Sequence, residues 1–166
     1  MFYFILATLA TPRNHTIDDT IGDDITGDVP TYTPSSVWNA GQDCPSCSVQ
    51  PDQSLAFDQT WHAATYGPSD NTPRSIDFSF NGTAIYVFGI IANKVSGATT
   101  LTNITVVLDG KRVGSFVHTP DNTNTLKYNV LLYGSPSIPR NNHHVTLQLN
   151  GATSTSLLLF DYAIYT

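Results

Sequence analysis

The sequence is poor in charged residues and in long apolar runs. Only 12% of its 166 residues are charged, and its seven lysines and arginines are scattered, with only Lys111 and Arg112 adjacent, for a net charge of −6. A protein that binds nucleic acid needs a basic stripe to neutralise phosphates, so we expect no nucleic-acid partner. Beyond the N-terminus, the longest apolar stretch runs from Leu157 to Tyr165 and is interrupted by Asp161. It is far shorter than the about 20 residues of a membrane helix, so we expect no membrane span.

Signatures of catalysis and of helices are also missing. The sequence has no G-x-S-x-G elbow, no phosphate-binding loop and no complete set of metal ligands at a standard spacing. No window of eleven residues has the apolar stripe of an amphipathic helix. We therefore expect a protein that is not an enzyme and is not helical.

Hydroxyl and amide side chains are what the sequence has in abundance. Its polarity comes mainly from 22 Thr, 14 Ser and 12 Asn, which suits a secreted or cell-surface β protein. Glycosylation sequons begin at Asn14, Asn81 and Asn103, although this composition yields about three by chance. We expect a single β-sandwich domain over residues 14–166. Residues 1–13, which begin with ten mostly apolar residues, are expected to be a truncated signal segment or an extra edge strand.

Alternation with a period of two is the strongest structural signal. Residues 75–80 alternate apolar and polar side chains, Asn81-Gly82 is a typical hairpin turn, and residues 83–91 form an apolar run. We therefore predict an antiparallel hairpin from Ser75 to Phe88, turning at Asn81-Gly82. The side chains expected to point inward are Ile76, Phe78 and Phe80.

Further strands complete an all-β pattern. A second hairpin is predicted around Asp109-Gly110, from residues 103–108 and 111–117. The remaining strands are expected at residues 127–133, 144–149 and 156–165. Seven or eight strands separated by Gly, Pro and Asn loops predict an antiparallel β-sandwich with jelly-roll topology, with a closed barrel as the alternative.

One segment of about thirty residues concentrates the side chains that bind ligands in other proteins. It contains both tryptophans, both cysteines and a histidine. Aromatic faces beside hydrogen-bonding groups suit a sugar, and the candidate ligand-binding residues are Trp38, Asp58, Trp61, His62 and Tyr66. His62 could act as a general base oriented by Asp58. The alternative is that the tryptophans are buried and that His62 satisfies a loop carbonyl.

The pair Cys44 and Cys47 has three interpretations, which are a redox dithiol, half of a zinc site and a local disulfide. The flanking residues are typical of a loop and not of a thioredoxin motif, and the later histidines lack the spacing of additional zinc ligands. A disulfide across so short a loop would constrain the unfolded chain by only ~2 kcal/mol. Its role would be to stiffen the loop.

A second cluster consists of five aspartates in an eleven-residue loop, Asp18, Asp19, Asp23, Asp24 and Asp28. Carboxylates are the oxygen ligands that calcium prefers. No glutamate closes the loop as an EF-hand requires. The alternative is that Asp18 and Asp19 accept backbone hydrogen bonds in Asx-turns while the others are solvated.

The order of these motifs resembles that of a known family. The stretches 14–23, 38–47, 50–52, 56–62 and 160–163 together resemble the extracellular domain of uncharacterised surface proteins of mushroom-forming (basidiomycete) fungi. This resemblance implies a galactose-binding-domain-like jelly roll, an extracellular setting and a Cys44–Cys47 disulfide. Jelly rolls of this class often hold a structural calcium between an N-terminal loop and the last strand. The candidate calcium ligands are Asp18, Asp19, Asp23 and Asp161.

Three functions of different classes follow. The leading hypothesis is a non-catalytic extracellular recognition module that binds a glycan or a cell-wall component weakly through the loops at one end of the sandwich. The second is a structural or adhesive surface protein that self-associates. The third is a hydrolase that uses a carboxylate pair such as Asp52 and Asp58.

Overall fold

Two antiparallel sheets packed face to face make up the described part of the chain. The computed structural model describes residues 13–166, so the expectation of a signal segment or edge strand lies outside the described residues except for Arg13. No α-helix occurs in residues 13–166. The strands are β1 (His15–Asp18), β2 (Gly22–Asp23), β3 (Thr31–Thr33), β4 (Asn39–Ala40), β5 (His62–Tyr66), β6 (Arg74–Gly82), β7 (Ile85–Ala92), β8 (Thr102–Leu108), β9 (Lys111–His118), β10 (Leu126–Ser135), β11 (Asn141–Leu149) and β12 (Ser156–Tyr165).

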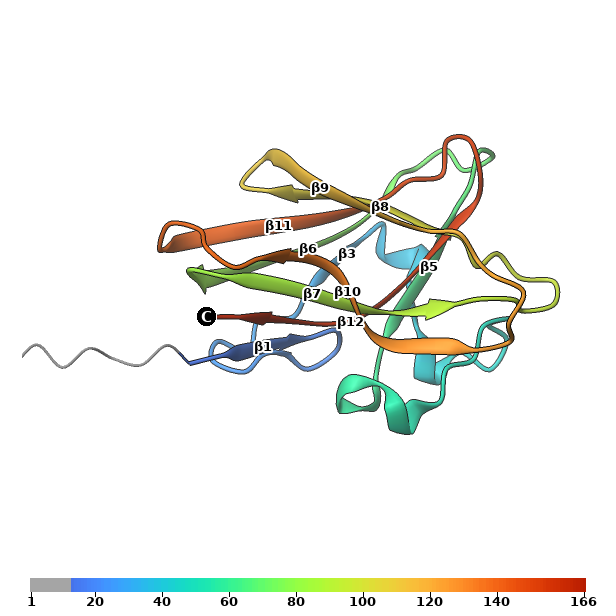
Figure 1. Ribbon diagram of the computed structural model, residues 1–166, viewed down its shortest axis with the longest axis horizontal. Helices are drawn as coiled ribbons and strands as arrows, with labels where there is room; N and C mark the ends of the chain where they lie inside the picture. The colour runs from blue at the N-terminus through green and yellow to red at the C-terminus, as the bar shows by residue number, and fades with distance from the viewer. Residues whose placement is uncertain (1–12) are drawn as a thin grey trace, which may run out of the picture.

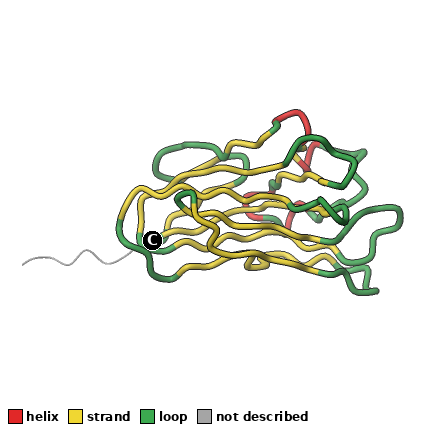
Figure 2. The backbone as a smooth tube through the Cα atoms, turned by 90° about the horizontal axis from the view of Figure 1, so that it is seen from above, coloured by secondary structure: helices red, strands yellow, loops and turns green. Residues whose placement is uncertain are grey.

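The strand order confirms the predicted β-sandwich. Sheet A has the order β10-β7-β12-β1-β2, with β5 also paired to β12 and β4 paired to β5. Sheet B has the order β3-β6-β11-β8-β9. Figure 1 shows the two sheets as upper and lower layers, and Figure 2 shows the strands running lengthwise between loops at the two ends. Four short 3-10 turns, η1 (Ser35–Val37), η2 (Gly41–Asp43), η3 (Gln53–Leu55) and η4 (Phe57–Gln59), interrupt the loops.

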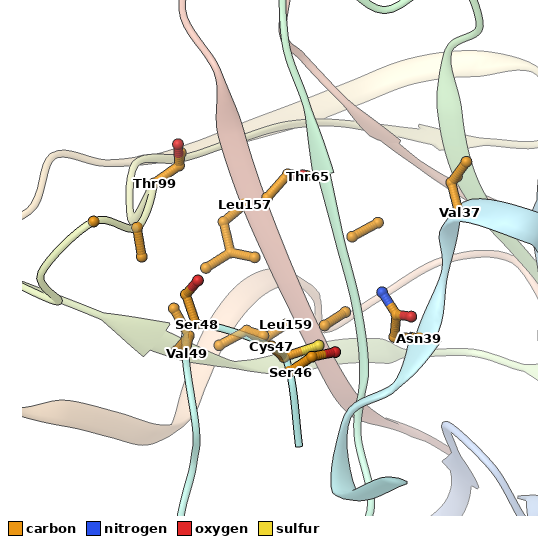
Figure 3. Close-up of a pocket in the computed structure, with 14 residues that line it drawn as sticks. Val37, Asn39, Ser46, Cys47, Ser48, Val49, Thr65, Thr99, Leu157 and Leu159 are labelled. Carbon is orange, nitrogen blue, oxygen red and sulfur yellow. The ribbon is translucent and has the colours of Figure 1, made fainter. Parts of the chain in front are cut away.

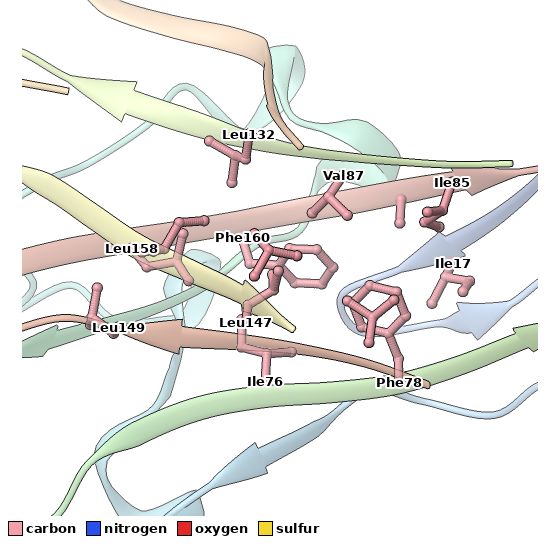
Figure 4. Close-up of a cluster of buried hydrophobic side chains, with 14 of the residues drawn as sticks. Ile17, Ile76, Phe78, Ile85, Val87, Leu132, Leu147, Leu149, Leu158 and Phe160 are labelled. Carbon is pink, nitrogen blue, oxygen red and sulfur yellow. The ribbon is translucent and has the colours of Figure 1, made fainter. Parts of the chain in front are cut away.

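The core lies between the sheets, where alternate side chains of β6, β8 and β11 are buried. Ile76, Phe78 and Phe80 of β6 point inward as predicted and belong to the main cluster of buried side chains. From sheet A they meet Val87 and Phe160 (Figure 4). Burying apolar surface contributes roughly 25 cal/mol per Å², so this cluster is the main source of stability.

The hairpin predicted between residues 75 and 88 is wrong. Strand β6 pairs with β3 and β11 in sheet B, whereas β7 pairs with β10 and β12 in sheet A. Thr83 and Ala84 therefore connect the two sheets. The Asn-Gly signal failed because Gly82 is not in the left-handed region that a two-residue hairpin requires. A Cβ at Gly82 would lie 2.6 Å from the carbonyl oxygen of Thr166, so glycine is needed for close packing.

The second predicted hairpin is confirmed. Strands β8 and β9 pair directly, and the turn between them is Asp109-Gly110. Both residues have positive φ angles, 51° and 75°, as a type I′ turn requires. The two hairpin predictions differ in outcome because Asp109 and Gly110 adopt the left-handed conformation and Gly82 does not. The sequence makes this conformation possible, and tertiary packing determines whether it forms.

Strand β12 is buried on both faces and has two partners along one edge. Its first half, Ser156–Phe160, pairs with β5, and its last residues, Tyr162–Tyr165, pair with β1. Asp161 falls between the two, at a register shift where β12 pairs with β7 on its other edge. A β-bulge of this kind redirects a side chain and interrupts the ladder. We call this gap between β1 and β5 the seam.

Candidate functional site

The seam gathers buried carboxylates around Asp161. The Asp161 side chain is 0% exposed. Its Oδ1 accepts a hydrogen bond of 3.0 Å from the backbone N–H of Phe57. Its Oδ2 is buried and has no hydrogen-bond partner in the described residues. A buried carboxylate oxygen without a donor is costly, so this atom calls for a proton or a cation.

Asp18 and Asp19 line the seam from the end of β1. Oδ1 of Asp18 accepts hydrogen bonds from the backbone N–H groups of Thr20 (2.8 Å) and Ile21 (2.6 Å), which is the Asx-turn alternative. Asp19 instead binds side chains. It accepts hydrogen bonds from the hydroxyls of Thr60 (2.6 Å) and Thr20 (2.8 Å), and its Oδ2 lies 2.6 Å from Nδ1 of His62.

His62 is oriented by Asp19 and not by Asp58 as the sequence suggested. Its ring stacks on Tyr32, with ring centroids 4.0 Å apart. The Tyr32 hydroxyl donates to the backbone carbonyl of Asp19 at 2.6 Å. Asp58 is exposed, with a φ of 43°. The histidine therefore joins the edge of sheet B to the seam, and sequence spacing could not find Tyr32 or Thr60 as its neighbours.

The environment of the seam disfavours the ionised form of its carboxyl groups. Burial, and then the negative charges of Asp19, Asp18 and Asp58, raise the pKa of Asp161 to about 7 against the hydrogen bond from Phe57. Burial also raises the pKa of Asp18, although two backbone hydrogen bonds oppose the shift. Desolvation of a carboxylate favours its neutral form. A pKa of about 7 means that Asp161 gains or loses its proton near neutral pH.

The donor set meets part of what calcium requires. Two carboxylate oxygens are available at the seam, Oδ2 of Asp161 and Oδ2 of Asp18. Within residues 13–166 the latter accepts one hydrogen bond, 3.4 Å long, from the hydroxyl of Thr60. Calcium takes six to eight oxygen ligands, so carbonyls or waters would have to supply the others. In residues 13–166 no group of three or more His, Cys, Asp or Glu side chains is placed to hold a metal ion.

The structure does not bring Asp23 into this group. Oδ1 of Asp23 accepts hydrogen bonds from the N–H groups of Ile25 and Thr26 and from the hydroxyl of Tyr165. Asp24 and Asp28 are exposed. The cluster of aspartates in the sequence therefore divides between the seam, a turn and the solvent.

The expected aromatic platform is not exposed. Trp61 is 2% exposed and lies in a second buried cluster under the loop, while Trp38 is 8% exposed and donates its indole N–H to the carbonyl of Thr33. Tyr66 is half-buried against the core and below the guanidinium of Arg74. The sequence alternative of buried tryptophans therefore holds, because the loop from residue 41 to 60 folds over Trp61. Neither tryptophan offers a free face to a sugar.

Cys44 and Cys47 form the predicted disulfide. The loop behind it is fastened by Gln50, whose side chain donates to the carbonyl oxygens of both cysteines at 2.9 and 2.6 Å. A bond between the sulfurs leaves no thiolate for zinc. The disulfide loop, residues 44–49, is thus held over the outer face of sheet A.

A groove of about 370 Å³ runs beside the disulfide loop (Figure 3). Its floor is apolar and consists of Ala63 on β5 and of Leu157 and Leu159 on β12. Polar side chains stand around it on the disulfide loop, on the β7–β8 loop and on strands β4 and β5. They are Asn39, Ser46, Ser48, Thr65 and Thr99. No pattern in the sequence pointed to Thr99, which is 50 residues from Val49 and reaches the groove from the loop between β7 and β8.

The other candidate residues have simple surroundings. Asp52 accepts hydrogen bonds from the N–H and hydroxyl groups of Ser54, and the hydroxyl bond lowers the pKa of this carboxyl. A general acid needs a raised pKa, so Asp52 does not suit that one role. Among the sequon asparagines, Asn14 and Asn81 are exposed, and Asn103 is partly exposed on β8. No helix in residues 13–166 is long and apolar enough to cross a membrane.

Comparisons with known proteins give a structural likeness and no match in sequence. No family model matches the chain, and no curated protein matches it in sequence. The solved Agl-KA catalytic domain resembles it with a TM-score of 0.55 at 10% identity, over 98% of this chain. The chain spans 30% of that domain's length.

Two other solved structures resemble the chain more weakly. A family 35 carbohydrate-binding module from Clostridium thermocellum has a TM-score of 0.44 at 12% identity, covering 82% of this chain and 98% of that one. The Podospora anserina GH26-CBM35 β-(1,4)-mannanase has a TM-score of 0.38 at 15% identity, covering 82% and 27%. Membership of a fungal surface family stays a prediction. At these identities the likeness concerns the β-sandwich fold, and a ligand has to be argued from the geometry of the chain itself.

Proposed function

We propose that this chain is a non-catalytic extracellular recognition module that binds a saccharide in the groove beside the disulfide loop. The observation that carries the proposal is the combination of an apolar floor, Ala63, Leu157 and Leu159, with a rim of hydroxyl and amide groups. A sugar ring has an apolar C–H face and an edge of hydroxyls, so it needs both kinds of surface together. A groove of about 370 Å³ is at the small end of ligand sites.

The disulfide supports this function in two ways. It holds Ser46 and Ser48 in place before a ligand arrives, which lowers the entropy lost on binding. It also agrees with an extracellular setting, because disulfides persist mainly in oxidising compartments. The floor has no exposed aromatic ring, so the expected affinity is weak.

A blocking variant tests the groove. Ser48→Trp would fill the groove from its exposed rim, and Ser96→Trp adds the same bulk to the neighbouring β7–β8 loop outside the groove. We expect glycan-array screening, followed by NMR titration of the best ligand, to show binding that Ser48→Trp abolishes and Ser96→Trp preserves. Equal binding by both variants would exclude the groove as the site.

We propose in addition that the seam holds a structural calcium through Asp161 and Asp18, with Asp19 keeping His62 and Thr60 in place around it. The unpartnered Oδ2 of Asp161 supports this ion. Calcium would supply positive charge to a buried cluster of carboxylates. None of these seam residues lines the groove, so the ion would act on stability.

Self-association is the second candidate function. Three large apolar side chains are exposed on the segment between β1 and β3, namely Ile21, Ile25 and Val29, at 62%, 63% and 51%. Exposed apolar side chains that form one patch are typical of interaction surfaces. Analytical ultracentrifugation of Ile25→Ser beside the unmodified chain tests this alternative, since a dimer formed through the segment would dissociate more readily in the variant.

A further inference from the structure

A larger cavity, of about 670 Å³, lies at the end of the sandwich where β12 finishes. It is bounded by the loop between β2 and β3, by the end of β6 and by the start of β11. Leu157, in the groove, and Tyr165, in this cavity, are eight residue steps apart along β12, which corresponds to roughly 25 Å. The cavity is therefore a separate site, at the end of the sandwich where β12 reaches the C-terminus, which Figure 1 marks at left.

Two of the few basic side chains in the chain line this cavity. They are Arg13 and Arg140, in a protein with only seven lysines and arginines. The ion pairs in residues 13–166 involve His15, His62, Arg74, His143 and His144 as the basic partners. Arg13 and Arg140 therefore have no carboxylate partner in the described residues, although Asp23 and Asp28 line the same cavity. Guanidinium groups without a partner are suited to a carboxylate or a sulfate ester.

The position of Arg140 is fixed by the residues around it. Nε2 of His143 is 2.8 Å from the carbonyl oxygen of Pro139, and Nδ1 of the same ring is 2.7 Å from Oδ2 of Asp109. The Asp109 carboxylate also accepts the backbone N–H of His144 at 2.9 Å. These bonds hold the turn that carries Arg140 against the β8–β9 hairpin. The arginine is thus mounted on a rigid turn, as a binding residue should be.

Polar groups of other kinds surround the two arginines. Asn81 and Asn142 are cross-strand partners of β6 and β11, and both side chains are exposed at the cavity. On the opposite wall, all three hydrogen bonds to Asp23 go to Oδ1, from Ile25, Thr26 and Tyr165. The Asp23 carboxylate is therefore held still as an acceptor. Amide donors, a fixed acceptor and cations are together what a polyhydroxylated anion requires.

We propose that this cavity is a second ligand site, specific for a saccharide that carries one anionic group. The anion binds Arg140 and Arg13, while the ring hydroxyls bind Asn81, Asn142 and Asp23. A carboxylate and a sulfate ester share this chemistry. The site is independent of the groove beside the disulfide loop.

NMR titration with three monosaccharides tests the proposal. The probes are galacturonate, galactose 6-sulfate and uncharged galactose, and the observed signals are the side-chain amides of Asn81, Asn142 and Asn39. We expect at least one anionic sugar to shift the signals of Asn81 and Asn142 and not that of Asn39, which lies in the groove. Losing one charge-assisted contact should weaken binding roughly tenfold, so galactose should bind about that much more weakly. The stronger anionic probe identifies the carboxylate or the sulfate ester as the preferred group.

Matched variants separate a built site from a general charge effect. Arg140→Gln should weaken the anionic sugar roughly tenfold and leave galactose unaffected. Arg112→Gln removes the same charge from an exposed position on β9 that does not line the cavity, and it should change neither. Equal losses in the two variants, equal affinity for charged and uncharged sugars, or no binding of either anion would overturn the proposal. Since Ser48→Trp blocks only the groove, failure there and failure here are distinguishable.

Discussion

Replacing Asp161 by asparagine should stabilise the protein at alkaline pH and leave it nearly unchanged at acidic pH. Asparagine keeps the shape of the side chain and an oxygen to accept the N–H of Phe57, 3.0 Å away. It removes the negative charge that burial disfavours. The variant therefore isolates the cost of ionising one buried carboxyl at the seam.

The magnitude follows from the pKa of Asp161. Its value of about 7 in the folded protein exceeds the ordinary 3.8 by about three units. One pKa unit corresponds to 1.36 kcal/mol, so ionised Asp161 destabilises the folded state by up to about 4 kcal/mol. A group whose pKa is raised by folding contributes its stability below its unfolded pKa, and this contribution is lost as the pH rises through the folded pKa. The loss for Asp161 therefore runs from about pH 4 to just above pH 7.

Thermal unfolding in EDTA at pH 5 and pH 8 provides the assay. At pH 8, Asp161→Asn should melt higher by up to roughly 8–16 °C, from 2–4 °C per kcal/mol for a domain of this size. At pH 5 the difference should be much smaller, because Asp161 is then mostly protonated. Asp18, whose pKa is also raised, remains in both proteins and gives both a residual slope of the same sign. A variant that melts lower than the unmodified protein at pH 8, or a difference that is equal at both pH values, would refute the reasoning.

Three further outcomes are expected. Millimolar calcium at pH 8 should raise the melting temperature of the unmodified protein and not that of Asp161→Asn, and equal shifts would show that the Asp161 carboxylate is not a ligand. Trp61→Ala should destabilise the fold by about 3–5 kcal/mol in urea unfolding, because the ring is buried under the loop, whereas an unchanged midpoint would contradict that burial. Burial lowers the pKa of His143, but the hydrogen bond that its ring donates to Asp109 helps to raise this pKa above its ordinary value, so this pair should stabilise the protein below about pH 6.5 and lose that effect as the pH rises. NMR titration of the His143 ring in Asp109→Asn should give a lower pKa than in the unmodified protein.

The strands were predictable because alternation in the sequence has one physical cause. An inward side chain such as Ile76 or Phe78 must be buried whichever strand lies next to it. Pairing partners depend on the whole chain, which is why the same sequence signal succeeded at Asp109-Gly110 and failed at Asn81-Gly82. A turn motif such as Asn-Gly indicates that the backbone can adopt a left-handed turn at low energy. Whether the chain forms that turn depends on how the two sheets pack.

In the candidate site, too, the local features were predictable from the sequence and the long-range contacts were not. The Cys44–Cys47 disulfide and the Asx-turn at Asp18 are local and were within reach of the sequence. The contact between Asp19 and His62 joins residues 43 positions apart, and that between Phe57 and Asp161 joins residues 104 apart. The sequence predicted that aromatic and acidic groups would matter and offered both an exposed platform and buried tryptophans, without deciding between them. Burial of Trp61 depends on the loop that closes over it.

The acidic seam follows from the topology of β12 and not from a ligand-binding loop. Because β1 and β5 divide one edge of this strand between them, the residue where they meet has no ordinary ladder partner. The backbone carbonyl of Asp161 accepts the N–H of Asp19 at 3.2 Å, and its carboxylate reaches Phe57, so main-chain groups at the gap are satisfied by acidic residues. That arrangement leaves negative charge in the interior, which a proton or a cation must balance. The groove and the larger cavity lie toward opposite ends of the same strand. A proton or calcium at the seam should therefore change the free energy of unfolding of the domain. It should not change which ligand either site binds.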